Sequence, residues 1–556
     1  MILLKLVVIG AVAGGTSAAA KARRNSEDLE IVVYEKDVDI SYSGCGMPYF
    51  IGDDVKDGGL LTPRDPEYFN KKYNIDIKTA HEVLAIDTVK KALTVKNLET
   101  GLIFVDTYNL LIFATGASSF IPPIKGHDLN HVFSLRNIRN MYKIKNFVNQ
   151  NHPKSVVIIG TGFIGLELAE NLHHLGLDVT MIEKLPQVSP SLDADMAIYV
   201  QKELSKHGVK VHINKGITSI ENSFVILDDA TEIPTDMVII STGVKPNIAL
   251  AKQTGIHLGI TGAISVNERM ETNIKDIYAC GDCIQVYHQV TKKPVYRPLG
   301  STANKTGRIA GDNASGGFAT FKGIIGTSIY KIFDLAVAQT GLTEKEALNE
   351  GFDIITSFNI KPHKPEYLGG KEIIIKTVAE KSSGKILGAQ IIGKDGVDKR
   401  IDIFATAITF GATAENLMDL DLAYAPPFAT TKDPVMYSGM IIHNALFRGR
   451  KILSAEQVLE IIESNRSYTI IDTRIPKQYA EGHVPSAINI PHEKLREELH
   501  HLDKNVTTIT YCNKGVTGNA TQNILLNAGF KDVYSISGGY RTFTTYLEVT
   551  KKEGIK

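Results

Sequence analysis

Short runs of consecutive apolar residues recur along the chain, and several of them end in a glycine-rich turn. The first run covers Leu3–Ile9 and a second covers Ser155–Ile159. Runs that are apolar at almost every position, as these are apart from Lys5 and Ser155, are typical of parallel strands covered on both faces. In each case a helical segment follows, and then a further apolar strand at Ile31–Tyr34 or at Val179–Ile182. The pattern predicts two βαβ units and an α/β fold.

Each predicted βαβ unit contains a dinucleotide-binding turn. In the second unit the glycine pattern is complete, whereas in the first unit Val12 replaces the middle glycine. The glycines let the backbone approach a pyrophosphate, the helix N-terminus stabilises its charge, and the acid that ends the second strand can accept hydrogen bonds from a ribose. The expected cofactor-binding residues are Gly10, Gly14, Gly15 and Glu35 in the first unit and Gly160, Gly162, Gly165 and Glu183 in the second.

The second half of the chain has a different order of predicted strands and helices. After about residue 325, strand-like runs such as Lys371–Lys376 alternate with helical segments such as Arg400–Phe410. A separate pattern begins at Ser454, in which the apolar strand Thr508–Cys512 leads directly into the loop Cys512–Gly518. A loop between a strand and a helix can aim backbone N–H groups at a sulfur and stabilise a thiolate or persulfide. Cys512 is therefore a candidate nucleophile.

Composition narrows the class of protein. A chain of 556 residues predicts roughly three to five domains. The 61 basic and 61 acidic residues cancel, so no global field favours nucleic acid or an anionic membrane. Four cysteines make no disulfide framework, which favours the reducing cytoplasm. The apolar first 20 residues are interrupted by glycines, unlike a signal peptide, and no stretch reaches the roughly 18 uninterrupted apolar residues of a membrane helix.

Two further motifs connect the βαβ units to a known family. Thr115 and Gly116 follow the apolar strand Leu110–Ala114, and Gly281 and Asp282 follow Ile277–Cys280. With the two glycine turns, these motifs resemble the flavoprotein pyridine nucleotide-disulfide oxidoreductases over residues 1–447. The resemblance implies that Thr115 and Gly116 mark the crossing between nucleotide domains. It also implies that Gly281 and Asp282 hold the ribityl and phosphate part of FAD.

The resemblance implies a domain order as well. The C-terminal region is similar to a rhodanese domain over about 100 residues, through Asp472-Thr-Arg474, Glu481–Pro491 and the Cys512 loop. The expected domains are an FAD-binding domain of residues 1–115 and 245–323, an NAD(P)H-binding domain of residues 150–244, an α+β dimerisation domain of residues 324–447 and an α/β rhodanese domain of residues 454–556. The two nucleotide-binding domains are expected to be Rossmann-like.

Cys45 is the candidate redox residue of the first domain. Reductases with an internal disulfide have a second cysteine four residues earlier, where this chain has Ser41. A single cysteine can instead pass through a sulfenic acid, as in NADH peroxidases and oxidases, or form a mixed disulfide with an external thiol, as in coenzyme A-disulfide reductases. The peroxidases and oxidases have a histidine three residues after the first glycine, where this chain has Ala13. The difference favours the coenzyme A-linked branch.

Coenzyme A has a 3′-phosphate and a pyrophosphate, so its site is expected to be basic. The candidates are Lys21, Arg23 and Arg24 at the end of the first helix, together with Ser41, and more weakly Lys71 and Lys72. Basic residues at a helix end can also simply complement the helix dipole. Tyr424 and Tyr367 resemble positions where coenzyme A reductases place a tyrosine of the other subunit near the mixed disulfide, and packing roles are the alternative for both.

These features predict a cytoplasmic, homodimeric reductase that uses FAD and NADH, with NADPH use possible because Lys184 follows Glu183. The expected substrates are coenzyme A persulfide or polysulfide, and coenzyme A disulfide. Reduction of coenzyme A disulfide with an accessory rhodanese, NADH oxidation, and a persulfide carrier or sensor of low turnover remain alternatives. We expect no metal site, because Cys280 and Cys283 lie in the FAD-contact turn and no second Cys/His pair accompanies them. The rhodanese loop has Lys514 but no arginine through Gln522, which leaves its sulfur donor open.

Overall fold

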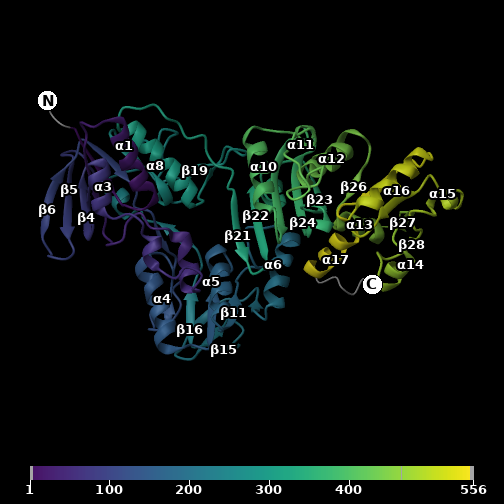
Figure 1. Ribbon diagram of the computed structural model, residues 1–556, viewed down its shortest axis with the longest axis horizontal. Helices are drawn as coiled ribbons and strands as arrows, with labels where there is room; N and C mark the ends of the chain where they lie inside the picture. Colours follow the sequence, from purple (N-terminus) through teal and green to yellow (C-terminus); the bar gives the residue numbers. More distant parts are fainter. Residues whose placement is uncertain (1–3, 465, 551–556) are drawn as a thin grey trace. The chain divides into compact units, whose positions relative to one another are not determined.

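The computed structural model describes residues 4–464 and 466–550. The chain forms two compact units, one made of Met1–Pro186 and Gly208–Ile324 and the other of Gln187–His207 and Ile325–Lys556. Figure 1 gives the order of the elements along the chain. None of the helices in the described part of the chain has the length and apolar content that a membrane crossing requires.

The first unit contains two parallel five-stranded sheets. The first sheet has the order β18-β7-β1-β2-β3, and its strands are β1 (Lys5–Ile9), β2 (Glu30–Tyr34), β3 (Asp76–Lys78), β7 (Leu110–Phe113) and β18 (Ile277–Ala279). The second sheet has the order β12-β11-β10-β16-β9, with β9 (Val132–Phe133), β10 (Ser155–Ile159), β11 (Asp178–Ile182), β12 (Lys210–His212) and β16 (Met237–Ile240). The strands predicted from their apolar runs are all present, although Leu3 lies outside the described residues.

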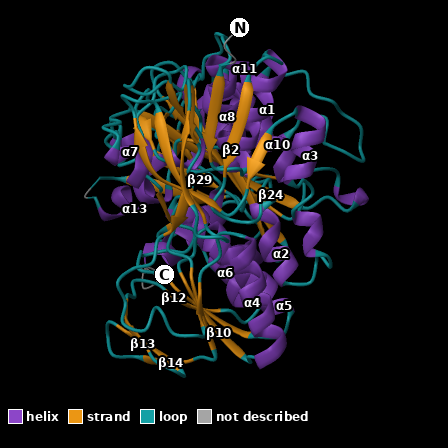
Figure 2. Ribbon diagram, turned by 90° about the vertical axis from the view of Figure 1, so that its left-hand side faces the viewer, coloured by secondary structure: helices purple, strands orange, loops and turns teal. Residues whose placement is uncertain are grey.

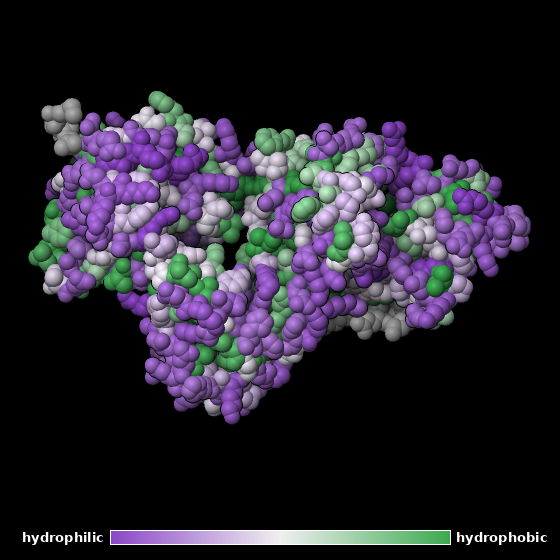
Figure 3. All heavy atoms as spheres, in the orientation of Figure 1, coloured by the Kyte–Doolittle hydropathy of each residue, from purple (hydrophilic) through white to green (hydrophobic). Residues whose placement is uncertain are grey.

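The remaining elements of the first unit surround these sheets. Its helices are α1 (Ala13–Asn25), α2 (Met47–Ile51), α3 (Pro66–Tyr73), α4 (Ile138–Asn151), α5 (Phe163–His174), α7 (Ala249–Gln253) and α8 (Gly300–Ala314), with 3-10 turns η1 (Gly44–Gly46), η2 (Gly58–Leu61) and η3 (Gly281–Cys283). Its antiparallel strands are β4 (His81–Asp87), β5 (Ala92–Asn97), β6 (Ile103–Thr107), β8 (Ala117–Ser119), β13 (Ile217–Ile220), β14 (Phe224–Leu227), β15 (Glu232–Pro234), β17 (Val244–Pro246), β19 (Val286–Tyr287) and β20 (Pro294–Val295). In Figure 3, hydrophobic atoms appear at the left-hand edge, where β4–β6 lie in Figure 1.

Helices α1 and α8 lie side by side at unusually short range (Figure 1). A Cβ atom on Gly307 would lie 2.3 Å from the carbonyl oxygen of Gly14, and one on Gly311 would lie 2.1 Å from that of Ala18. Because both distances are far below a van der Waals contact, only glycine fits at these two positions of α8. The close packing brings the exposed residues of α8 next to those of α1.

The second unit contains a mostly buried antiparallel sheet of order β21-β22-β25-β24-β23. Its strands are β21 (Ser328–Ile332), β22 (Leu335–Gly341), β23 (Ile354–Pro362), β24 (Glu372–Glu380) and β25 (Ile386–Gly393), and every residue of β25 is buried. The accompanying helices are α6 (Ala194–Lys206), α9 (Glu344–Asn349), α10 (Val397–Thr409), α11 (Ala414–Met418) and α12 (Pro434–Phe447), with the 3-10 turn η4 (Glu366–Leu368). The helix expected over Arg400–Phe410 is thus present as α10.

The C-terminal part of the second unit is a parallel sheet of order β26-β30-β29-β27-β28 with helices around it. The strands are β26 (Ile452–Leu453), β27 (Tyr468–Asp472), β28 (Ala487–Asn489), β29 (Thr507–Tyr511) and β30 (Val533–Ile536). The helices are α13 (Ala455–Glu463), α14 (Pro476–Glu481), α15 (Leu495–Glu498), α16 (Val516–Asn527) and α17 (Gly539–Thr550), with the 3-10 turn η5 (Leu499–His501). Figure 2 shows the strands of the chain, orange, gathered into sheets with helices outside them. The fold class is therefore the predicted α/β architecture with an α+β domain between.

Candidate active site

The turn after β1 has the geometry of a dinucleotide-binding turn. Gly10 has a φ of +106°, and a Cβ there would lie 2.2 Å from the carbonyl oxygen of Ala114. The Glu35 carboxylate accepts hydrogen bonds from the backbone N–H groups of Ala11 at 2.8 Å and Asp37 at 2.9 Å. Burial raises the pKa of Glu35, and these two hydrogen bonds oppose the rise. Glu35 lines a cavity of about 530 Å³ beside Gly10, together with Thr115, Tyr34 and His81 among others.

The turn after β10 repeats this arrangement. Glu183 is buried and accepts from the backbone N–H of Thr161 at 3.0 Å, from the Thr161 hydroxyl at 2.7 Å and from the N–H of Leu185 at 2.9 Å. Gly160 has a φ of +100°, and a Cβ there would lie 2.4 Å from the carbonyl oxygen of Ser241. No atom lies within 4 Å of the Cβ position of Gly162, so the backbone there is open to a ligand.

Residues from distant segments complete the first nucleotide site. A Cβ on Gly14 would lie 3.4 Å from the Cα of Gly281, so the turn that contains Asp282 rests directly on the start of α1. Asp282 forms an ion pair of 2.9 Å with Arg136. The Thr115 hydroxyl donates to the backbone carbonyl of Asn247 at 2.7 Å, and Gly116 has a φ of +66°. The glycine turn, the carboxylate of Glu35 and the turn that contains Asp282 together fit the chemistry of FAD, in which a helix N-terminus meets the pyrophosphate and an acid meets a ribose.

Cys45 lies in the 3-10 turn η1, immediately before α2, and its side chain is exposed. Desolvation, followed by the carboxylates of Glu167 and Asp282, raises the pKa of Cys45, and Arg136 acts in the opposite direction. Glu167, on α5, has a pKa raised to about 7 by burial and by Glu170. A carboxyl group with this pKa can change its protonation state near neutral pH, close to the thiol.

A cavity of about 540 Å³ opens beside the Cys45 loop. Ala13 at the start of α1 lines it together with Ser41 and Tyr42, which precede Cys45 by four and three residues. Its cationic residues come from three segments and are Arg24, Arg64, Lys305 and Arg308. None of these four cations pairs with a carboxylate in the described part of the chain, and no acidic side chain lines the cavity. Four unpaired cations give this cavity the charge that suits a polyanionic ligand.

The predicted substrate-binding residues divide into two groups. Arg24 and Ser41 line the cavity, whereas Lys21, Arg23 and Lys71 do not. The Arg23 guanidinium is buried and donates to four backbone carbonyls, those of Tyr73, Ser26, Glu27 and Asn74. Its geometry is that of a structural residue, which does not fit the predicted role. Lys21 pairs with Asp312 at 3.0 Å, and Lys71 with Glu67 on the exposed face of α3.

Three cavity cations were missed by sequence reasoning. Arg64 precedes α3, and Lys305 and Arg308 lie on α8, far along the chain from Cys45. The sequence signal for these cations was the pair Gly307 and Gly311, spaced four residues apart on one helical face. These glycines let α8 approach α1 closely, and the cations of α8 then lie in the same cavity as Arg24.

The two predicted tyrosines lie at the surface of the second unit. Tyr367 is in η4 with 78% of its surface exposed, and Tyr424 is 48% exposed. Tyr424 also lines a cavity of about 590 Å³ with Lys364, Lys399 and Phe428. Both side chains are therefore exposed within this chain.

The Cys512 loop connects β29 to α16. Cys512 is almost buried, at 8% exposure, and its carbonyl oxygen accepts from the backbone N–H of Tyr540 at 2.8 Å. A Cβ on Gly539 would lie 2.2 Å from that oxygen, so this contact requires glycine. Within the described residues, the amide groups of Asn513, Lys514 and Gly515 donate to no protein oxygen. These free N–H groups follow the sulfur directly and are suited to an anion on it.

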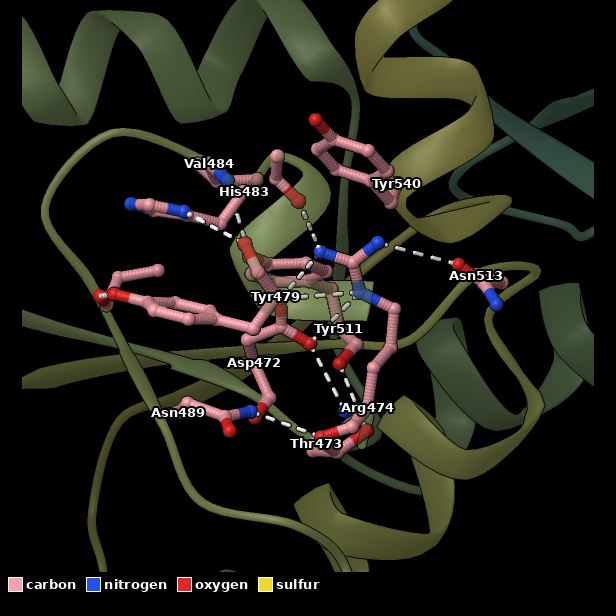
Figure 4. Close-up of polar contacts among 12 residues, drawn as sticks. Asp472, Thr473, Arg474, Tyr479, His483, Val484, Asn489, Tyr511, Asn513 and Tyr540 are labelled. Carbon is pink, nitrogen blue, oxygen red and sulfur yellow. Dashed lines mark hydrogen bonds and ion pairs between the residues drawn. The ribbon is translucent and has the colours of Figure 1, made fainter. Parts of the chain in front are cut away.

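A buried polar network lies against the Cys512 loop and supports it (Figure 4). The Arg474 guanidinium donates to Asp472 at 2.6 Å and to Asn513 at 3.4 Å, and it lies 4.1 Å from the ring of Tyr540. The Tyr511 hydroxyl donates to Asp472 at 2.7 Å. Arg474 therefore links the strand end at Asp472 to the residue after Cys512.

Cys280 and Cys283 are both buried and unpaired. The Cys283 thiol lies 3.2 Å from the carbonyl oxygen of Cys280. Across residues 4–464 and 466–550, the only group of three potential metal ligands is Glu203, His207 and Asp334, which excludes both cysteines. Cys280 and Cys283 therefore contribute to the packing of the turn that contains Asp282.

The chain has two dinucleotide-binding turns and an accessible cysteine, and these are followed by an antiparallel domain and a second cysteine loop. This combination defines the class of a nucleotide-dependent oxidoreductase with an added α/β domain. The sequence signature of the pyridine nucleotide-disulphide oxidoreductases matches residues 4–295, and that of their dimerisation domain matches residues 327–434. A rhodanese-like signature matches residues 454–545. The chain belongs to the pyridine nucleotide-disulphide oxidoreductase family and contains a rhodanese-like domain. Family membership implies FAD and NAD(P)H as cofactors.

Similar proteins cover most or all of the chain. A relative named NADH oxidase from Methanocaldococcus jannaschii is 38% identical over 78% of this chain and 97% of its own length. A CoA-dependent NAD(P)H sulfur oxidoreductase from Pyrococcus furiosus is 38% identical over 79% and 99%. The reduced CoADR-RHD of Bacillus anthracis has a TM-score of 0.95, with 36% identity and 98% coverage of both chains. An NAD-dependent persulfide reductase from A. fulgidus has a TM-score of 0.89, with 35% identity and 97% and 100% coverage.

Proposed function

We propose that this chain is an NAD(P)H-driven reductase of coenzyme A persulfide and polysulfide, and of coenzyme A disulfide, whose rhodanese domain handles sulfane sulfur. The cationic cavity is the observation that carries the proposal. Coenzyme A has three phosphate groups, and Arg24, Arg64, Lys305 and Arg308 offer four unpaired cations to them. Ser41 and Tyr42 extend the cavity wall toward Cys45, so a ligand there can direct its thiol end to that cysteine.

In this proposal Cys45 is the only cysteine of the chain that takes part in the redox step. The Cys45 thiolate attacks the inner sulfur of coenzyme A persulfide, which forms a Cys45–coenzyme A disulfide and releases hydrosulfide. With coenzyme A disulfide, the same attack releases coenzyme A instead. FAD held by the first glycine turn would supply the electron pair of reduced nicotinamide, with which the mixed disulfide would return to the Cys45 thiolate and the coenzyme A thiol. Glu167, with its pKa of about 7, holds a proton close to Cys45.

Residues of the two dinucleotide turns hold the cofactors in this proposal. Glu35 and Glu183 bind the riboses of FAD and of the nicotinamide nucleotide, respectively. A carboxylate at the end of β11 repels a 2′-phosphate, so NADH is favoured. Lys184 is the next residue and is exposed, which leaves some capacity for NADPH.

The proposed active form is a homodimer. The dimerisation-domain signature and the exposed rings of Tyr367 and Tyr424 support a second chain at this surface. In the dimer the two hydroxyls approach the mixed disulfide of the other subunit, where a phenol donates a proton or hydrogen bond to the departing coenzyme A thiolate.

NADH oxidation is the second candidate, since one relative has that name. Oxygen or peroxide reduction through a sulfenic acid calls for a base beside the sulfur, and Ala13 occupies the cavity wall where the oxidases have histidine. Ala13 therefore favours the thiol-exchange reaction.

The test is one NADH assay with coenzyme A persulfide, polysulfide, coenzyme A disulfide, peroxide and oxygen as oxidants. We expect the coenzyme A compounds to give the highest kcat/KM. A matched comparison uses disulfides of coenzyme A and of pantetheine, because pantetheine has the same thiol arm without the phosphate-rich nucleotide. Equal kcat/KM for these two disulfides, or faster turnover with oxygen than with any sulfur compound, would refute the proposal.

A further inference from the structure

The Cys512 loop faces the edge of the dimerisation sheet within the second unit. The backbone N–H of Phe358 on β23 donates to the Ser537 hydroxyl at 2.8 Å. On the neighbouring strand β24, the Glu372 carboxylate accepts from Arg541 at 2.7 Å and also pairs with Lys514, the second residue after Cys512. Glu372 therefore fixes the loop against β23 and β24, and it neutralises two cations beside the loop, Lys514 and Arg541.

One cation on this sheet edge is left unneutralised. Lys361 lies on the same edge strand, β23, three residues after Phe358. Its ammonium lies over the ring of Tyr437 at 4.5 Å, and within the described residues it has no carboxylate partner. Burial lowers the pKa of Lys361; the charge on Cys512 opposes this effect and Lys514 adds to it.

An unpaired, half-buried ammonium costs free energy unless an anion is nearby. Cys512 provides such an anion in its thiolate and persulfide forms. The rhodanese loop itself has no arginine from Asn513 through Gln522, and its lysine is bound to Glu372. The loop thus lacks a free side-chain cation of its own, while the adjacent strand presents one.

We propose that the sulfurtransferase site spans two domains, with Lys361 of the dimerisation domain as the cation that stabilises the Cys512 thiolate and persulfide. The inference rests on the proposed sulfur-transfer function of Cys512. In the transfer, the Cys512 thiolate attacks the outer sulfur of a coenzyme A persulfide, the S–S bond of the donor breaks, and coenzyme A leaves as its thiolate. The products are Cys512 persulfide and coenzyme A, and no electrons are exchanged. Lys361 faces the negative charge before and after the step.

Glu372 has a positioning role in the same site. By binding both Lys514 and Arg541, it removes two cations that would otherwise attract a doubly charged donor such as thiosulfate. Among the described residues, Lys361 is then the free ammonium that this site offers, and it matches the single negative charge on the reacting sulfur of a persulfide better than the two charges of thiosulfate, which sit next to the transferred sulfur.

The experiment measures persulfide formation on Cys512 in a Cys45→Ser background, by mass spectrometry after addition of coenzyme A persulfide. Lys361→Met is compared with Lys361→Arg, which keeps the charge, and with Lys381→Met, which removes an exposed lysine paired with Asp353. We expect Lys361→Met to slow persulfide formation roughly 10- to 100-fold and to shift iodoacetamide alkylation of Cys512 to higher pH. Lys361→Arg should retain most of the rate, and Lys381→Met all of it.

The outcomes separate the inference from the function on which it rests. If the parent Cys45→Ser protein takes up no persulfide at Cys512, the proposed sulfur transfer fails. If it does, but Lys361→Met reacts at the parent rate and its alkylation profile is unchanged, the role of Lys361 is refuted. An equal loss in Lys361→Met and Lys361→Arg would also refute it, because charge would then be irrelevant. Thermal unfolding of each variant identifies any that fails to fold. Glu372→Gln gives a second, independent measurement: we expect a higher rate with thiosulfate relative to coenzyme A persulfide, and an unchanged or lower ratio would overturn the two-domain site.

Discussion

Cys45 and Cys512 occupy opposite electrostatic surroundings. Cys45 is exposed in a turn before α2, and the carboxylates of Glu167 and Asp282 help to raise the pKa of its thiol. Cys512 is nearly buried in a loop with free backbone amides, and two cations from that region are held by Glu372. Beside Cys45 the cation Arg136 is paired with Asp282, and the unpaired positive charge lies in the adjoining cavity, where a ligand can meet it.

The difference separates two kinds of sulfur chemistry. A cysteine that takes part in electron transfer needs a bound nucleotide beside it and room for a bulky disulfide partner. The binding energy of the disulfide partner can then orient the reacting sulfur atoms. A cysteine that stores a sulfur atom needs its own anion stabilised between reactions. We infer that Cys45 depends on coenzyme A for its positive surroundings, whereas Cys512 depends on groups built into the fold.

The largest loss of activity is expected from replacing Cys45 by serine. Cys45→Ser should lower NADH-linked turnover by roughly three orders of magnitude or more with every coenzyme A substrate, because no mixed disulfide can form. Cys512→Ser should have the reverse pattern, with sulfurtransferase activity lost and reduction of coenzyme A disulfide within about twofold of the parent. Steady-state kinetics of both variants with coenzyme A disulfide, coenzyme A persulfide and polysulfide check this division. Comparable losses in both variants with all three substrates would show that the two sites are not independent.

The elements around both cysteines were largely predictable, because their signals are local. The runs Ser155–Ile159 and Thr508–Cys512 are rich in β-branched and apolar residues and contain no charged residue, and they appear as β10 and as β29, which ends one residue earlier at Tyr511. The glycine turns were recognisable for the same reason: a φ near +100° at Gly10 and Gly160 can be met by few other residues.

The walls of the substrate cavity were less predictable, because they depend on tertiary packing. Arg308 lies 284 positions after Arg24, and only the contact of α1 with α8 makes them neighbours. Arg23 has the same charge and almost the same position as Arg24, yet its side chain turns inward to backbone carbonyls. Sequence spacing locates a basic helix end, but the rotation of the helix decides which arginine faces the ligand.

An intermediate effect is expected from the cavity cations. Arg308→Gln and Arg24→Gln should each raise the KM for coenzyme A disulfide roughly five- to tenfold with little change in kcat, because each removes one charge-assisted contact to a phosphate. Lys71→Gln is the matched control, since Lys71 pairs with Glu67 outside the cavity. The same assays with 3′-dephospho-coenzyme A disulfide identify the cation that binds the 3′-phosphate, because its variant should no longer discriminate between the two substrates. Unchanged KM values in both arginine variants would contradict coenzyme A binding in this cavity.

The smallest expected effect concerns the proton balance at Cys45. Above pH 7 the Glu167 carboxyl is mostly ionised, since its pKa is about 7, and its negative charge disfavours the neighbouring thiolate. Glu167→Gln removes that charge, so the Cys45 thiolate should form at lower pH, by roughly half a unit. Below pH 7 the parent and the variant should converge, because Glu167 is then protonated in the parent as well. The measurement is the pH dependence of iodoacetamide alkylation in a Cys512→Ser background, with Glu99→Gln, an exposed residue on the turn between β5 and β6, as the control. A shift to higher pH in Glu167→Gln would mean that Glu167 assists ionisation of Cys45 instead of opposing it, and the electrostatic contrast between the two cysteines would then be much weaker.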